Sequence, residues 1–150
     1  MLDLRVIKKQ GVFKVDAEFA SPEVGVTALF GRSGAGKTSV VNMVAGLVRP
    51  DGGHIVVNGR VVFDSEKGIH VPPEKRRMGY IFQDGRLFPH LSVKSNLSYG
   101  MRLTPAAERR VKFQDVVDLL GIGHLLSRRP ARLSGGEKQR VAIGRALLTS

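Results

Sequence analysis

The sequence predicts an α/β fold in which a glycine-rich loop joins a buried strand to a helix. The apolar run at residues 26–30 has the length and composition of a core strand. The glycine-rich loop at 31–39 follows it directly, and the helix is expected over residues 37–47. Alternating apolar residues near the N-terminus add antiparallel strands, and helical spacing dominates after residue 85.

The antiparallel strands are predicted from alternation and from turn residues. Gln10-Gly11 separates two stretches in which apolar and polar side chains alternate, and Asn58-Gly59 is the strongest short hairpin signal in the chain. The strands expected on this basis lie at residues 2–6, 13–19, 55–57 and 61–63. They form an antiparallel arm beside the loop and its helix.

The second half of the chain is predicted to be mainly helical. A short apolar run at 78–82 is expected to form a second core strand that ends at Gln83, and helices are expected over 91–101, over 104–120 and from Ser134 onward. We therefore divide the chain into a core with an antiparallel subdomain at 1–84, a helical subdomain at 85–132 and a final segment at 133–150.

Composition excludes several classes of protein. The chain has 150 residues, 42% of them hydrophobic, and no cysteine, which fits one cytosolic domain without disulfides or thiolate metal sites. No apolar run approaches the length that crosses a bilayer. The net charge of +11 is dispersed and lacks interleaved aromatic residues, so we expect a solvated basic surface and no nucleic-acid partner.

The glycine-rich loop has the pattern of a phosphate-binding loop. Gly31 and Gly36 bracket four residues, and Lys37-Thr38 follow. Such a loop points backbone N–H groups at phosphate oxygens and places the positive end of a helix beside them. Lys37 is expected to reach the β- and γ-phosphates of a nucleotide, and the Thr38 hydroxyl to bind Mg²⁺. The candidate nucleotide-binding residues are Gly31, Arg32, Ser33, Gly34, Ala35, Gly36, Lys37, Thr38 and Ser39.

A second motif, Leu133-Ser134-Gly135-Gly136-Glu137, lies about a hundred residues later and is called the signature segment below. Ser134 is a typical N-cap, so the segment predicts another anion site at a helix start. The chain resembles the nucleotide-binding subunits of ABC transporters in the order of its features. These are a phosphate loop, Gln83 at a strand end, a helical insertion and this segment.

The resemblance implies a P-loop NTPase core of ABC type with an antiparallel β arm and a helical insertion. It implies ATP and Mg²⁺ as cofactors, with Gln83 contacting Mg²⁺ or the attacking water. It also implies a homodimer, in which Ser134, Gly135, Gly136 and Glu137 face the γ-phosphate held by the second subunit. A membrane permease is expected to bind residues around 84–100, which places the protein peripherally on the cytoplasmic face of the inner membrane.

Residues outside the motifs are most similar to the ATP-binding subunits of molybdate importers. They include Asn58-Gly59-Arg60, the run 73–77 and the run 79–84. The resemblance therefore implies a subunit that couples ATP binding and hydrolysis to the uptake of molybdate or a similar oxyanion.

Two departures from the family accompany this resemblance. The family stacks adenine on an aromatic residue near the end of the first strand, and Phe13 is the nearest candidate here. After residue 150 the family continues into the Walker B strand with a second Mg²⁺-binding aspartate, then a general-base glutamate and a histidine. We therefore expect the 150 residues to bind nucleotide without hydrolysing it, with Lys37 and Gln83 as the catalytic residues present, and to expose apolar surface.

Two other classes of function remain open at this point. The first is a soluble ABC ATPase that acts on nucleic acid or ribosomes, which the basic charge permits. Such proteins carry long insertions, and none fits within 85–132. The second is a non-hydrolysing interaction module. Co-purification with a permease or with nucleic acid separates the transport ATPase from the first alternative.

Overall fold

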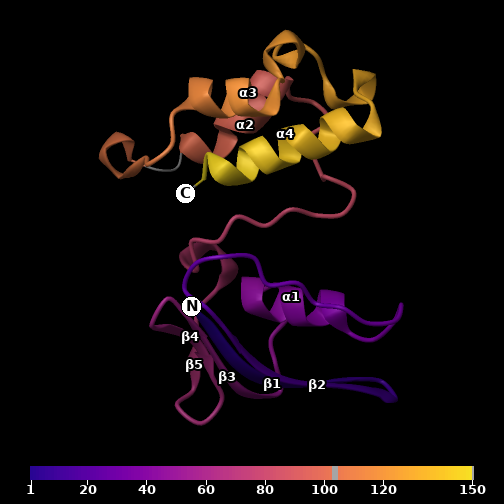
Figure 1. Cartoon of the computed structure of the whole chain (residues 1–150), viewed down its shortest axis with the longest axis vertical. Helices are drawn as coiled ribbons and strands as arrows, with labels where there is room; N and C mark the ends of the chain where they lie inside the picture. The colour runs from indigo at the N-terminus through magenta and orange to yellow at the C-terminus, as the bar shows by residue number, and fades with distance from the viewer. Residues whose placement is uncertain (103–104, 150) are drawn as a thin grey trace. The chain divides into compact units, whose positions relative to one another are not determined.

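The computed structural model describes residues 1–102 and 105–149, and the chain divides into two compact units, Met1–Arg76 and Arg77–Ser150 (Figure 1). The first unit holds the strands and the glycine-rich loop. The second holds the remaining helices, Gln83 and the signature segment. The subdomain limits expected at residues 84 and 132 stay predictions.

The first unit is built on a five-stranded antiparallel sheet in the order β2-β1-β3-β4-β5. Its strands are β1 Leu2–Gln10, β2 Phe13–Ser21, β3 Gly52–Val57, β4 Arg60–Asp64 and β5 Ile69–His70. Both predicted hairpins are confirmed. At the second hairpin Asn58 and Gly59 have φ values of 49° and 76°, the left-handed conformation that a tight turn of this type requires.

Helix α1, Lys37–Ala45, lies along one face of this sheet (Figure 1). Val40 and Met43 point from α1 into a core that contains the buried sheet residues Leu4, Ile55 and Phe63. Gly46 ends the helix with φ 83°, and its N–H bonds to helix carbonyls. This packing fixes the axis of the helix that follows the glycine-rich loop.

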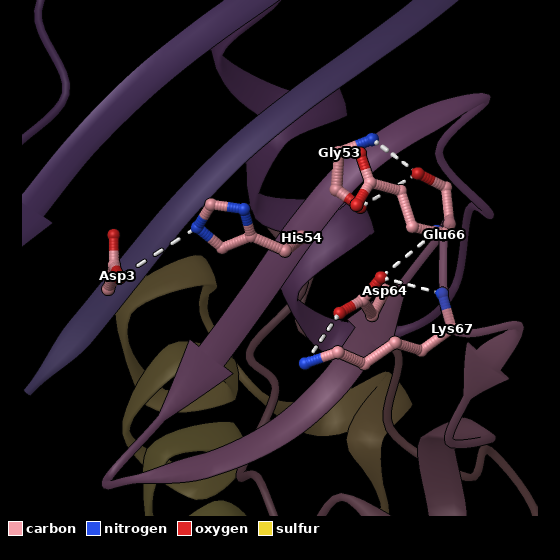
Figure 2. A network of polar contacts seen from close by, with 7 residues as sticks. Asp3, Gly53, His54, Asp64, Glu66 and Lys67 are labelled. Atoms are coloured by element: carbon pink, nitrogen blue, oxygen red, sulfur yellow. Dashed lines mark hydrogen bonds and ion pairs between the residues drawn. The ribbon is translucent and has the colours of Figure 1, made fainter.

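A polar network orders the turn after β4 (Figure 2). Asp64 Oδ1 accepts hydrogen bonds from the N–H groups of Glu66 and Lys67, each at 3.0 Å. The Ser65 hydroxyl accepts from Gly53 N–H at 2.9 Å and donates to Gly53 O at 3.1 Å. The turn is therefore tied back to β3 and extends the sheet toward β5.

The second unit packs three α-helices around its own core. They are α2 Val93–Met101, α3 Phe113–Leu120 and α4 Gly135–Leu147, with short 3₁₀ turns η2 Ala106–Glu108, η3 Gly123–Leu125 and η4 Pro130–Arg132 between them. α4 contacts both α2 and α3 (Figure 1). The fully buried residues of this core include Leu97, Ile122, Leu125 and Val141.

Three sequence expectations are wrong in detail. Residues 26–30 and 78–82 form no strand, because no described segment pairs with them and an unpaired segment has no ladder of hydrogen bonds to stabilise it. Val26 and Phe30 are 97% and 92% exposed, which confirms the expected apolar surface. The helix predicted over 104–120 is replaced by η2 and α3, and its expected start at Thr104 lies outside the described residues.

Candidate functional site

The glycine-rich loop uses left-handed backbone conformations that glycine adopts easily and other residues do not. Gly34 and Gly36 have φ values of 81° and 88°, in the left-handed region that disfavours side chains. Gly36 is also the N-cap of α1, so the N–H groups of the first helical turn have no partner within the helix. Arg32, Ser33 and Thr38 are exposed. The positive end of α1 is thus available to an anion beside the loop, within which Ala35 N–H donates to Arg32 O at 3.2 Å.

The ammonium group of Lys37 lies over this loop. Its Nζ donates hydrogen bonds to the carbonyl oxygens of Gly31 and Arg32, both at 2.7 Å. An ammonium has three donors, so a third remains to meet an anion. The Lys37 ammonium therefore lies against the loop, and its predicted contact with phosphate stays a prediction.

The β1–β2 hairpin lies against the start of α1. A Cβ on Gly36 would lie 3.0 Å from Val15 Cγ2 and 3.3 Å from Phe13 Cε1, and the Ser39 hydroxyl donates to Gln10 Oε1 at 3.2 Å. Phe13 is 41% exposed. The sequence candidate for adenine stacking thus lies beside the loop and is partly exposed.

In the second unit, Gln83 is exposed and begins a well-anchored segment. Arg145 in α4 donates to the carbonyl oxygens of Gly85 and Arg86 at 3.1 and 3.0 Å, and its guanidinium lies 5.3 Å from the centre of the Phe88 ring. Burial lowers the pKa of Arg145. The segment after Gln83 is therefore fixed to the helix of the signature segment.

Asn96 holds the next stretch of this segment. Its side chain is fully buried, accepts from Phe88 N–H at 2.8 Å and donates to the carbonyl oxygens of Phe88, Leu91 and Ser92 at 3.0 to 3.2 Å. One side chain thus contacts four backbone groups of residues 88–92, of which Phe88 O and Ser92 O also accept backbone N–H groups. This fixes the loop between Gln83 and α2.

The signature segment forms a complete capping box at the start of α4. Ser134 Oγ accepts from Glu137 N–H at 3.3 Å, and Glu137 Oε2 accepts from Ser134 N–H at 2.7 Å. The pKa of Glu137 is lowered chiefly by the hydrogen bond from the Ser134 backbone. The Ser134 side chain and the charges of Arg128 and Arg140 lower it further. Ser134, Gly135 and Gly136 are exposed, and the two glycine amides lie in the first helical turn.

Each unit thus carries part of the predicted site. The first brings together the loop, Lys37, Thr38, Ser39 and Phe13, and the second carries Gln83 and the signature segment. Sequence reasoning missed Arg76, Asn96 and Arg145. Asn96 had a signal, because it shares the buried face of α2 with Val93 and Leu97, but nothing distinguished Arg76 or Arg145 from other basic residues.

Other kinds of site find little support in the part of the chain that is described. Across residues 1–102 and 105–149, no three His, Cys, Asp or Glu side chains come together as metal ligands. No helix within these ranges combines the length and the apolar character that spanning a membrane demands.

Comparison with known sequences gives the same family as the motifs. Residues 15–150 match the family model described as ABC transporter. The chain is 67% identical over 150 residues to the molybdenum import ATP-binding protein ModC of Rhodospirillum rubrum, covering 100% of this chain and 40% of that protein. It is 64% identical to ModC of Paramagnetospirillum magneticum, covering 100% and 41%. The chain therefore spans about two fifths of the curated relatives it matches.

Solved structures confirm the predicted fold class. The ATP-binding cassette MJ0796, solved as a dimer in a post-hydrolysis state bound to ADP and Pi, matches 99% of this chain and 70% of its own with a TM-score of 0.77 at 25% identity. CbiO1 of Clostridium perfringens, part of the ABC transporter complex cbiONQ, matches 99% of this chain and 61% of its own with a TM-score of 0.73 at 27% identity. With its phosphate loop, its signature segment and these relatives, the chain belongs to the ABC transporter family.

Proposed function

We propose that this chain is the nucleotide-binding part of an importer subunit that couples ATP binding and hydrolysis to the uptake of molybdate or a similar oxyanion. The observation that carries the proposal is the glycine-rich loop with the Lys37 ammonium against it, in a chain 67% identical to a molybdenum import ATP-binding protein. The choice of molybdate rests on that identity, because no motif residue is expected to touch the transported anion.

The phosphate chain of ATP is proposed to lie on residues 31–39. The amides of the loop and the dipole of α1 attract the anion, and Lys37 supplies a full positive charge. The exposed Thr38 hydroxyl, in the first turn of α1, is a suitable oxygen ligand for Mg²⁺. Gln83 is proposed as a further Mg²⁺ ligand or as the residue that orients the attacking water. Phe13 is proposed to stack on adenine.

The signature segment is proposed to bind the γ-phosphate held by a second copy of the subunit. Ser134 Oγ accepts a hydrogen bond from Glu137 N–H, so its own hydrogen is available for a phosphate oxygen. The amides of Gly135 and Gly136 lie at the positive end of α4, a helix of 13 residues. Arg128 and Arg140, which act on the Glu137 carboxylate, also make the surroundings favourable for an anion.

The 150 residues alone are proposed to bind Mg-ATP without hydrolysing it. A general base needs a free carboxylate aimed at water. Glu137 is engaged in the capping box, and an Asp84 oxygen lies 3.4 Å from Arg86 Nε. Both are therefore poor substitutes for the family glutamate. The intact protein is proposed to act as the ATPase.

The partners follow from the same proposal. A second ATP-binding subunit completes each site, and residues around 84–100 meet an integral membrane permease. The protein is then peripheral on the cytoplasmic face of the inner membrane. Anchoring by Arg145 and Asn96 makes the segment around 85–92 a rigid surface for such a contact.

The experiment compares the intact protein with its Lys37→Ala variant in two assays. The first measures phosphate release from Mg-ATP by the protein, and the second measures molybdate uptake by cells that express it. We expect the variant to lose both, with Lys67→Ala, an exposed lysine outside the loop, as the matched control. Uptake that continues in the Lys37→Ala variant would contradict the transport role. Phosphate release by the 150-residue chain that depends on Lys37 would contradict the proposed lack of hydrolysis.

A further inference from the structure

We propose that Arg76 is a positioning residue of the nucleotide site, which fixes the far end of the helix that carries the phosphate loop. The inference rests on the nucleotide-binding function proposed above. Arg76 Nη1 donates to the carbonyl oxygens of Met43 and Val44 in the last turn of α1, at 2.8 and 2.7 Å, and Nε donates to Val71 O at 2.7 Å. Arg76 thereby joins α1 to the chain at 71–76.

The burial of this side chain is unusual for an arginine. Arg76 is 4% exposed, and burial lowers its pKa. Within residues 1–102 and 105–149, its guanidinium pairs with backbone carbonyls and with no carboxylate. Two of those carbonyls belong to the negative end of the α1 dipole, which favours a cation there. A phosphate at the loop and Arg76 would thus hold the same helix by opposite charges at its two ends.

Gly46 leaves room for this guanidinium because it has no Cβ. It has φ 83°, and a Cβ built on it would lie 2.6 Å from Arg76 Nε and 2.9 Å from Arg76 Cζ. An alanine at position 46 would therefore displace the guanidinium while the charge stays in the protein. Gly46 and Arg76 form a matched pair that two independent substitutions can probe.

Arg76 also lies at the boundary between the two units of the chain. Arg76 is the last residue of the first unit, and the backbone continues from it through residues 77–82 to Gln83. The same guanidinium therefore fixes both the far end of the loop helix and the point from which the Gln83 segment departs. Nucleotide binding at the loop is then expected to stabilise residues 71–76 as well as α1, because binding and ordering are reciprocal.

The first test measures the Kd of a non-hydrolysable ATP analogue with Mg²⁺ for the folded full-length protein, at a temperature well below its melting point. We expect Arg76→Lys and Gly46→Ala each to raise that Kd by about 3- to 30-fold. Arg49→Lys, the same change at an exposed arginine three residues after Gly46, should leave it within about twofold. A purely structural role would lower the melting temperature and leave the Kd of the folded protein unchanged, which would overturn the proposal.

A second measurement needs no variant and decides the matter if the substitutions prevent folding. Amide hydrogen exchange of the wild-type protein is compared with and without the Mg²⁺-analogue complex. We expect slower exchange at residues 43–48 and at 71–76 when the analogue is bound. Protection confined to residues 31–39 would overturn the positioning role while leaving nucleotide binding intact. A wild-type protein that does not bind the analogue would instead refute the proposed function.

Discussion

Arg145 in the last turn of α4 donates a hydrogen bond to the carbonyl oxygen of Gly85, two residues after Gln83, at 3.1 Å. A second bond reaches Arg86 O at 3.0 Å. The helix that begins at the signature segment is therefore tied at its other end to the segment that contains Gln83. Gln83 and Ser134, two parts of the candidate site that lie far apart in sequence, thus belong to the same compact unit.

Replacing Arg145 should release this tie. Arg145→Gln removes the charge and the forked donor geometry, and we expect the second unit to lose about 1–3 kcal/mol, the usual worth of hydrogen bonds to a charged group. Amide exchange should rise at residues 85–88. Arg140→Gln, an exposed position five residues earlier in α4, is the matched control. Unchanged exchange at 85–88 would show that the two bonds do not fix the segment.

Asn96 is expected to be the most sensitive polar residue of the second unit. Asn96→Ala removes the hydrogen-bond partner of Phe88 N–H and of Leu91 O, whereas Phe88 O and Ser92 O still accept the N–H groups of Leu91 and of residue 96. We expect a loss of about 3 kcal/mol, measured by denaturant unfolding. Gln114→Ala, an exposed amide on α3 that bonds to Asp118, serves as control and should change stability by less than about 0.5 kcal/mol.

Gly36→Ala should damage both stability and nucleotide binding. The substitution forces a side chain into φ 88° and against Val15 and Phe13, with an expected loss of about 1–3 kcal/mol and a weaker affinity for Mg-ATP. Gly68→Ala imposes similar strain at φ 66° in open space, far from the loop in sequence. If Gly68→Ala weakens Mg-ATP binding as much as Gly36→Ala does, strain rather than loop geometry accounts for the effect.

The capping box of α4 should make stability depend on pH. The pKa of Glu137 is lower in the folded protein than its ordinary value of 4.5, chiefly because its carboxylate accepts the Ser134 N–H. The contribution of Glu137 to folding stability is therefore fully present above pH 4.5. It is lost as the pH falls through the pKa that Glu137 has in the folded protein. We expect the wild type to be more stable than Glu137→Gln at pH 7, with a difference that shrinks by pH 3. Denaturant unfolding at both pH values measures it.

The parts of the fold that depend on local pattern were predictable from sequence. Alternation and Asn58-Gly59 gave both hairpins, and Ser134 with Glu137 gave the start of α4, because these signals act between near neighbours. The strands predicted at 26–30 and 78–82 are absent, because a strand does not depend on near neighbours alone. A core strand depends on partners from elsewhere in the chain, and apolar composition alone does not supply them.

The candidate site shows the same division. The roles proposed for Lys37 and the loop glycines follow from a compact motif, whereas Arg76 and Arg145 bond to backbone carbonyls, which carry no sequence signature. Arg76 bonds to residues 32 and 33 positions away, and Arg145 to residues 59 and 60 positions away. Only the folded structure distinguishes these arginines from the basic residues on the surface.

The most direct test of the account is the binding of Mg-ATP to the 150-residue chain, measured by titration calorimetry with and without the Lys37→Ala change. The account predicts that the wild-type chain binds one Mg-ATP and that Lys37→Ala abolishes or severely weakens this binding. Lys67→Ala should bind as the wild type does. Binding that is equally tight in the wild type and in Lys37→Ala would contradict the claim that the loop at 31–39 holds the nucleotide.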